Sequence, residues 1–386
     1  MKKLWLLSPF ILSLLSSPLC GQEAETAIAD NTTEVANRYS YGQPRWTKEK
    51  CRTCFEPKES YRLPREFNGW NSFAEALVWQ VQEQGSFFVA TPNDDSVVIP
   101  AFNQTQLLGD LRSLSFDWDG GVRLGLGYTF ARDFWQLMGQ YTWFATTGDN
   151  SYSMRAPTAT TTTWLMPTFT DIESTGLIEA ESSSRFSYQM ADLMLSRRFL
   201  PKDEIQLNFA LGATGGYIKE DSHIFYENVG MNTAVVNHWG FGGGGLRTNF
   251  DANWHMGRGF GFFGKFSYAA ILGQYGTKNR ISADSPGIDG GGVTAARRIA
   301  NTTCTGIYLL PATQIALGFD WTRSFGNCWI SDLRIALTGE FNHLSNLHQI
   351  FKDPIDTSDV SFGKLYVRDI SSVYMYGVDV RLGADF

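Results

Sequence analysis

The nine residues Val122-Arg-Leu-Gly-Leu-Gly-Tyr-Thr-Phe130 alternate between large apolar side chains and small or polar ones. Successive side chains of a β-strand point to opposite faces. Val122, Leu124 and Leu126 therefore share one face of the strand, and Arg123 lies on the other face with two glycines. A strand with one apolar and one polar face suits a barrel with lipid outside and a polar interior.

The same alternation recurs along the chain and predicts about ten antiparallel strands. They lie near residues 71–82, 115–130, 134–145, 185–199, 204–217, 239–254, 259–273, 307–322, 328–343 and 370–386. Most exceed the roughly 5–6 residues usual for soluble strands. They suit tilted strands that cross the hydrocarbon with about 9–11 residues. A strand hidden within residues 84–102 would raise the count to twelve.

The connections between these segments alternate between short and long. The short ones are residues 132–133, 201–203, 255–258 and 324–327. The long ones lie near residues 83–114, 146–184, 218–238, 274–306 and 344–369. Short periplasmic turns and long extracellular loops are typical of outer-membrane barrels. We therefore expect residues 70–386 to form an all-β, antiparallel transmembrane barrel.

The composition agrees with this class of protein and excludes others. The chain has 386 residues with 38 glycines, 14% aromatic residues, 18% charged residues and a net charge of −7. A hydrophobic content of 43% is too high for a disordered chain. The negative charge argues against a nucleic-acid binder. The chain lacks the apolar runs of about 20 residues that polytopic helical membrane proteins need.

The first residues have the pattern of a secretory signal. Lys2 and Lys3 precede a short apolar stretch, Leu4–Leu15, and small residues follow it. We expect a signal peptide over residues 1–21. Residues 22–69 are polar and without a clear period, which predicts an N-terminal extension on the periplasmic side.

Four cysteines follow the predicted signal peptide, namely Cys51, Cys54, Cys304 and Cys328. Cys51 and Cys54 form a C-x-x-C motif, but neither a second such motif nor a nearby histidine pair completes a zinc site. In an exported protein, cysteines form disulfides within the chain or with neighbours. Four cysteines allow three pairings, and we expect neither a metal nor a cofactor.

The charged residues on the polar face are the candidates for lining the barrel interior. They are Arg123, Asp192, Arg247, Asp251, Lys265, Asp320, Arg334, Glu340, Asp379 and Arg381. One interpretation is that they form cross-strand ion pairs that brace the barrel. The other is that they line a water-filled path and bias which solutes enter.

The apolar face of the strands and the glycines of the inner face carry two further expectations, about the lipid contact and the width of the lumen. The residues expected to face lipid are Val122, Leu124, Leu126, Phe209, Leu317 and Leu337. Eight strands enclose an interior filled by side chains, so about ten strands leave only a narrow lumen. Inner-face glycines, Gly125, Gly212, Gly318 and Gly377 among them, are expected to leave extra space.

The chain ends in an alternating segment with a terminal aromatic residue. Its residues are Tyr376, Val378, Val380, Leu382 and Phe386. The segment resembles the carboxy-terminal recognition strand of barrels inserted by the bacterial outer-membrane assembly machinery. That machinery and outer-membrane lipid are therefore expected partners.

Several segments resemble the Legionella major-outer-membrane-protein-like, pore-forming family, which also occurs in environmental relatives of the chlamydiae. They are Phe73-Ala-Glu-Ala-Leu-Val-Trp79, Phe116-Asp-Trp118, Gly121-Val-Arg-Leu-Gly-Leu-Gly-Tyr128, Asp133-Phe-Trp135 and Tyr141-Thr-Trp143. The resemblance implies a porin of the Gram-negative outer membrane, with no catalytic residues. The cysteines also look like those of chlamydial envelopes, where disulfides cross-link neighbouring proteins.

The predicted function is passive diffusion of small hydrophilic solutes or ions. One alternative is a structural surface antigen or adhesin, which the long loops favour. A less favoured alternative is a barrel protease with histidines and acids at the rim. Its candidate residues are His223, His238, His343, His348, Asp221, Asp284, Asp289 and Asp353.

Overall fold

The computed structural model describes residues 69–92, 109–130, 135–153, 177–202, 204–228, 231–284, 297–325, 330–352 and 367–386. The expected signal peptide and nearly all of the N-terminal extension lie outside these residues. Cys51, Cys54 and Cys328 lie outside them as well. Within the described part of the chain, no helix has the length and apolar character needed to cross a membrane.

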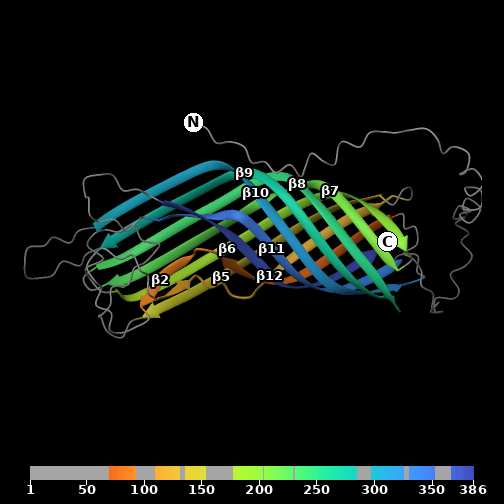
Figure 1. Ribbon diagram of the computed structural model, residues 1–386, viewed down its shortest axis with the longest axis horizontal. Coiled ribbons are helices and arrows are strands. Elements are labelled where there is room, and N and C mark those ends of the chain that lie inside the picture. Colours follow the sequence, from red (N-terminus) through yellow and green to blue (C-terminus); the bar gives the residue numbers. More distant parts are fainter. Residues whose placement is uncertain are drawn as a thin grey trace, which may run out of the picture. The chain divides into compact units, whose positions relative to one another are not determined.

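Ten antiparallel strands form a closed barrel, which confirms the predicted fold and strand count (Figure 1). They are β1 (Gly69–Glu83), β4 (Asp119–Thr129), β5 (Trp135–Ser153), β6 (Leu177–Lys202), β7 (Ile205–Asn228), β8 (Met231–Gly257), β9 (Phe260–Asp284), β10 (Arg297–Ser324), β11 (Asp332–Lys352) and β12 (Val367–Asp385). From β4 onward each strand pairs with the next along the chain, and β1 pairs with both β12 and β4 to close the ring.

Two further strands lie outside the ring. β2 (Phe87–Pro92) and β3 (Gly109–Ser113) pair only with each other. The sequence interpretation with twelve barrel strands is therefore wrong, although β2 does fall within the segment that suggested it. Both strands belong to the connection between β1 and β4, and we call them the first-loop hairpin.

The short connections share one end of the barrel, which we call the turn end; the other end is the loop end. At the turn end β8 and β9 meet in the tight turn Gly257-Arg258-Gly259, whose residues all have positive φ, between 54° and 100°. Residues 203–204 link β6 to β7. The expected alternation of connections fails once at the loop end, because residues 229–230 alone separate β7 from β8.

Strands at the loop end extend well past their predicted ends. The sequence predicted a long connection over residues 218–238, whereas β7 and β8 continue through it as paired strands. The period of two persists there, but its polarity inverts: Ile218 points inward and is buried, and Lys219 lies outside. The physical reason is a change of surroundings, since beyond the lipid the outer face meets water.

The inversion gives the barrel an apolar core near the loop end. Leu77, Trp79 and Val81 of β1 are buried in this core, and Ile218 and Ile271 join them from β7 and β9. Nearer the turn end, the inward side chains are mostly polar and charged. The interior thus has two parts with different chemistry.

Candidate functional site in the barrel interior

Arg123 is the centre of a buried ion-pair network in the polar part of the interior. Its guanidinium lies 2.8 Å from the Glu75 carboxylate of β1 and makes two hydrogen bonds, 2.8 and 3.0 Å long, to Glu340 of β11. Its Nε donates to Thr142 at 3.1 Å. Two strands, β1 and β12, separate β4 from β11 in the ring. Arg123 thereby links strands of the wall that do not pair with each other.

Further polar groups complete this network. Gln314 donates to Glu340 at 2.6 Å, and Arg381 lies 3.3 Å from Glu75. The Trp79 indole donates to Asp379 at 2.7 Å. A guanidinium that makes two parallel hydrogen bonds to one carboxylate is a strong and geometrically specific contact. The network therefore supports the interpretation that these charges brace the barrel.

A second polar group lies on β5 to β8. Arg247 lies 2.6 Å from Asp192, which also accepts a hydrogen bond of 2.7 Å from Gln140. Asp251 accepts a bond of 3.2 Å from Asn208 of β7 and stands opposite Lys265 of β9 in the register. The remaining predicted pair, Arg334 and Asp320, lies 3.5 Å apart near the turn end.

The inner face of β8 carries a row of polar side chains that we call the polar ladder: Arg247, Asn249, Asp251, Asn253 and His255. Each has one buried side-chain nitrogen or oxygen atom without a hydrogen-bond partner among the described residues. Buried polar atoms in proteins are nearly always hydrogen-bonded, to protein or to water. A polar cavity with several such atoms holds water. The ladder therefore presents to the barrel interior several polar atoms that water can satisfy.

Neighbouring strands contribute further atoms of this kind. They are Oδ1 of Asp192, Oγ1 of Thr214, Oγ of Ser267 and Oδ1 of Asp320. All lie on β6, β7, β9 and β10, on the same side of the barrel as β8. Asn71, Gln314 and Asp379, on the strands of the Arg123 network, also have one such atom each, so spare polar atoms occur around the whole interior.

An aromatic layer closes the interior toward the loop end. Its members are Trp79, Phe116, Phe144, Phe186, Tyr188, Trp239, Tyr275 and Tyr308. Their rings form a series of contacts with centroids 5.4 to 6.4 Å apart. Arg123 lies 5.4 Å from the Trp79 ring centroid, so the layer rests directly on the ion-pair network.

The first-loop hairpin and the segment after it pack onto the aromatic layer. The Tyr226 hydroxyl donates to the Phe88 carbonyl at 2.9 Å, and the Phe88 side chain is fully buried. Gln80 donates to the Phe116 carbonyl at 2.9 Å, and the Phe116 ring contacts Phe186. The sequence did not predict this packing, because the sequence of a loop does not indicate which residues its aromatic side chains will contact.

The expectation that inner-face glycines leave space is wrong at several positions. A methyl group at Gly125 would collide with the Phe73 ring, and one at Gly377 with Trp79. Met194 and Phe263 similarly fill the space beside Gly212 and Gly318. Glycine here allows large neighbouring side chains to lie flat on the wall, which narrows the lumen.

The residues expected to face lipid point away from the interior. Val122, Leu124, Leu126, Phe209, Leu317 and Leu337 are exposed by 38% to 56%. Near the turn end, Tyr128 contacts both Trp70 and Phe130, with ring centroids 5.2 Å apart in each pair. Aromatic residues at the border of an apolar band mark a membrane interface.

The terminal strand completes the ring as β12. Val378, Val380 and Leu382 lie on its outer face, and β12 pairs with β1 and β11. Cys304 lies within β10 rather than in a loop, is partly exposed and forms no disulfide with another described residue.

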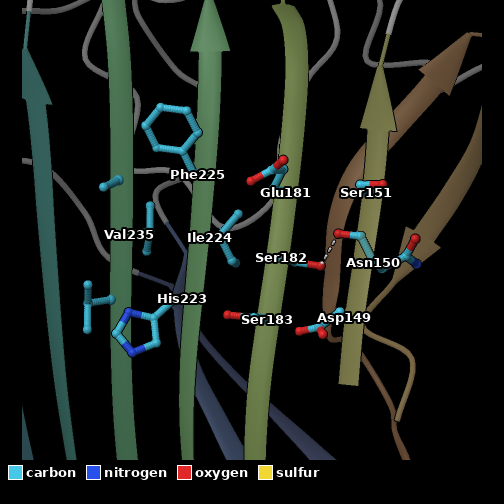
Figure 2. A pocket seen from close by; sticks show the side chains of 12 residues that line it. Asp149, Asn150, Ser151, Glu181, Ser182, Ser183, His223, Ile224, Phe225 and Val235 are labelled. Atoms are coloured by element: carbon cyan, nitrogen blue, oxygen red, sulfur yellow. Dashed lines mark hydrogen bonds between the residues drawn. The ribbon is translucent and has the colours of Figure 1, made fainter. Parts of the chain in front are cut away.

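At the rim, a pocket of about 550 Å³ lies on β5 to β8. Figure 2 shows Asp149, Glu181, His223 and Phe225 around it. Of the residues considered for a rim protease, the structure brings together His238 and Asp221, whose Nδ1 and Oδ1 atoms are 2.7 Å apart.

His223 joins this pair, because its ring centroid lies 6.0 Å from that of His238, and the remaining candidate with a described side chain, His343 of β11, does not contact these three residues. His343 stacks on Tyr374, with centroids 4.8 Å apart. Asp289 and Asp353 lie outside the described residues, and the side chains of His348 and Asp284 are not described.

Comparison with solved structures finds other outer-membrane β-barrels. The outer membrane protease OmpT of Escherichia coli has 9% identity and a TM-score of 0.39, with 82% of this chain and 97% of that chain covered. The toluene transporter TodX of Pseudomonas putida has 10% identity and a TM-score of 0.31, with 83% and 90% covered. No curated protein matches the sequence significantly.

A protein-family model described as the Legionella pneumophila major outer membrane protein precursor matches residues 62–339. The match covers well over half of the chain and nine of the ten barrel strands in whole or in part, from β1 into β11. The turn end is accordingly periplasmic and the loop end extracellular. The chain belongs to the family of the Legionella pneumophila major outer membrane protein and is an outer-membrane β-barrel protein.

Proposed function

We propose that the protein is a narrow channel for passive diffusion of small hydrophilic solutes or ions. The polar ladder of β8 carries this proposal. From Arg247 to His255 it spans eight residue steps, or about 26 Å along the strand at roughly 3.3 Å each. At a tilt of about 35–45°, this covers about 20 Å of membrane depth. Most of the apolar thickness is thereby crossed by one hydrated row of polar groups.

The aromatic layer and the first-loop hairpin close this path on the extracellular side. Water from the periplasm can reach the ladder, but a solute must pass beside Trp79 and Phe116 to leave the barrel. Conduction therefore requires the hairpin or these rings to move. We infer that the single-channel conductance is small. The closure at the extracellular side limits it more than the barrel width that follows from the number of strands.

A structural surface protein is the second candidate. The ion-pair network of Arg123 and the packed aromatic layer favour it, because both fill the barrel with side chains. A filled barrel displays its extracellular segments rigidly whether or not it conducts.

We also propose that residues 1–21 direct export and that the terminal strand is recognised by the assembly machinery. Disulfide bonds within the chain or to neighbouring molecules through Cys51, Cys54, Cys304 or Cys328 belong to the same proposal.

The test is single-channel recording of the refolded full-length protein in planar lipid bilayers. We expect stepwise conductance. Asn249→Asp adds a negative charge to the polar ladder and should raise the cation-to-anion permeability ratio. Thr303→Asp is the matched control, since it adds the same charge on the outer face of β10. A silent bilayer with correctly folded protein would refute the channel and favour the structural role; equal selectivity of the two variants would refute the assigned path.

A further inference from the structure

The outer face of the barrel changes from apolar to basic on adjacent strands at the extracellular side. On β9, Leu272 is the last large apolar outward residue, and Lys278 and Arg280 follow it on the same face. On β7, Lys219 directly follows the exposed Tyr217 on that face. Lys219 therefore stands directly above the apolar band, and Lys278 and Arg280 stand about 15 and 20 Å above the depth of Leu272, at roughly 3.3 Å per residue and a tilt of about 40°.

The register brings more of this surface together. Arg185 of β6 stands opposite Asp221 of β7, Asp221 opposite His238 of β8, and His238 opposite Lys278 of β9. Neighbouring strands lie about 4.8 Å apart, so the row from Arg185 to Lys278 spans about 14 Å. We call Arg185, Lys219, Lys278 and Arg280 the basic belt.

The members of the basic belt have no ion-pair partner among the described residues. The acid closest to them in the register, Asp221, is bonded to His238 at 2.7 Å. The next acids, Asp149 and Glu181, lie on β5 and β6 nearer the rim, in the pocket of Figure 2. Lys278 and Arg280, the members of the basic belt on β9, are two or more strand spacings away from both Asp149 and Glu181.

The distribution of these cations is uneven around the ring. Beyond the apolar band on the extracellular side, every outward Lys or Arg of the barrel strands whose side chain is described lies on β6, β7 or β9. Outward Arg197 and Arg323 lie instead at the periplasmic border.

We propose that the basic belt binds the phosphate groups of anionic lipid headgroups in the outer leaflet. Arg and Lys are the side chains that bind phosphate oxygens by charge-assisted hydrogen bonds. The belt continues the lipid-facing surface, so one lipid places its chains on Leu272 and its phosphates on Lys278 and Arg280. The occupant is thus a phosphorylated lipid held at a fixed side of the barrel.

The test is native mass spectrometry of the folded full-length protein in detergent, incubated with a bisphosphorylated glucosamine lipid or its dephosphorylated form. The double variant Lys278→Gln/Arg280→Gln should retain the phosphorylated lipid about 30-fold less well, at roughly fivefold for each charge removed. The control variant Arg323→Gln removes an outward charge at the periplasmic border and should bind as the parent does. Folding is checked by the heat-dependent mobility of each variant in gels.

Four outcomes overturn the proposal. Equal retention by the double variant and the parent would show that the belt does not hold the lipid. An equal loss in Arg323→Gln would show nonspecific charge attraction. Retention of the dephosphorylated lipid to the same extent would show that the phosphate is not the group recognised. Displacement by inorganic phosphate alone would show that the belt binds free phosphate rather than the lipid.

Discussion

Replacing Arg123 by Met tests whether the buried network holds the barrel together. Methionine fills part of the space of the arginine side chain but removes the charge and all its donors. The Glu75 and Glu340 carboxylates would then remain inside the barrel, where their side chains are 1% and 2% exposed. Glu340 would lose the cation that compensates its burial, and Glu75 would keep only the Arg381 guanidinium, 3.3 Å away.

The expected loss of stability is about 3–5 kcal/mol, the usual cost of removing one partner from a buried pair. Arg123 has two carboxylate partners, which places the estimate toward the upper end. The triple variant Arg123→Met/Glu75→Gln/Glu340→Gln removes the unpaired charges together with the cation. It should recover most of the loss, because neutral amides can satisfy one another. Arg247→Met, with one carboxylate partner, should cost less than Arg123→Met.

The assay is equilibrium unfolding by urea of protein folded into lipid vesicles, followed by tryptophan fluorescence. The reasoning is refuted if Arg123→Met costs less than about 1 kcal/mol, the level typical of exposed pairs. It is also refuted if the triple variant is less stable than the single one. Either result would mean that water, rather than Arg123, screens these carboxylates.

Two further predictions concern the membrane face and the extracellular closure. Leu124→Arg should destabilise the barrel by about 2–4 kcal/mol and Tyr128→Arg by about 0–1 kcal/mol, because the cost depends on depth; equal costs in the same unfolding assay would contradict the assigned lipid face. Glu83 and Glu220 are both buried, and burial together with the nearby Glu220 carboxylate raises the pKa of Glu83 well above its usual value, so the two carboxyl groups lie together only while one of them is protonated. Their contact is present at acidic pH and lost as pH rises, so proteolysis of the first-loop hairpin should become faster at alkaline pH, and Glu83→Gln should abolish that pH dependence. A pH dependence unchanged in Glu83→Gln would exclude the carboxyl pair as its cause.

The fold was predictable from the sequence because the membrane imposes a simple rule on a strand. Val122 to Phe130 alternate with period two, and the structure places Leu124 and Leu126 outside and Arg123 inside. The same rule located ten strands and their order. The rule failed to predict that β7 continues past Ile218. From there on the apolar residues lie on the inner face and the polar residues on the outer face, and this change led to the interpretation of the segment as a loop.

The candidate site was predictable only in part. All ten charged residues expected on the inner face lie there, but Glu75 was missed. It shares its face with Leu77 and Trp79, and these apolar neighbours conceal the inward direction of the strand. The prediction that inner-face glycines leave extra space failed because a side chain of the neighbouring strand fills the space beside the glycine, as Phe73 does beside Gly125.

By itself the sequence determined which faces of the strands are apolar and polar, since that property depends on residues two apart in one strand. Only the tertiary structure decided which charges meet. Arg123 and Glu340 are 217 residues apart in the chain, and closure of the ring brings them into contact. The burial of Phe88 of the first-loop hairpin beside Tyr226 was likewise a tertiary outcome, because these two residues are 138 apart in the chain.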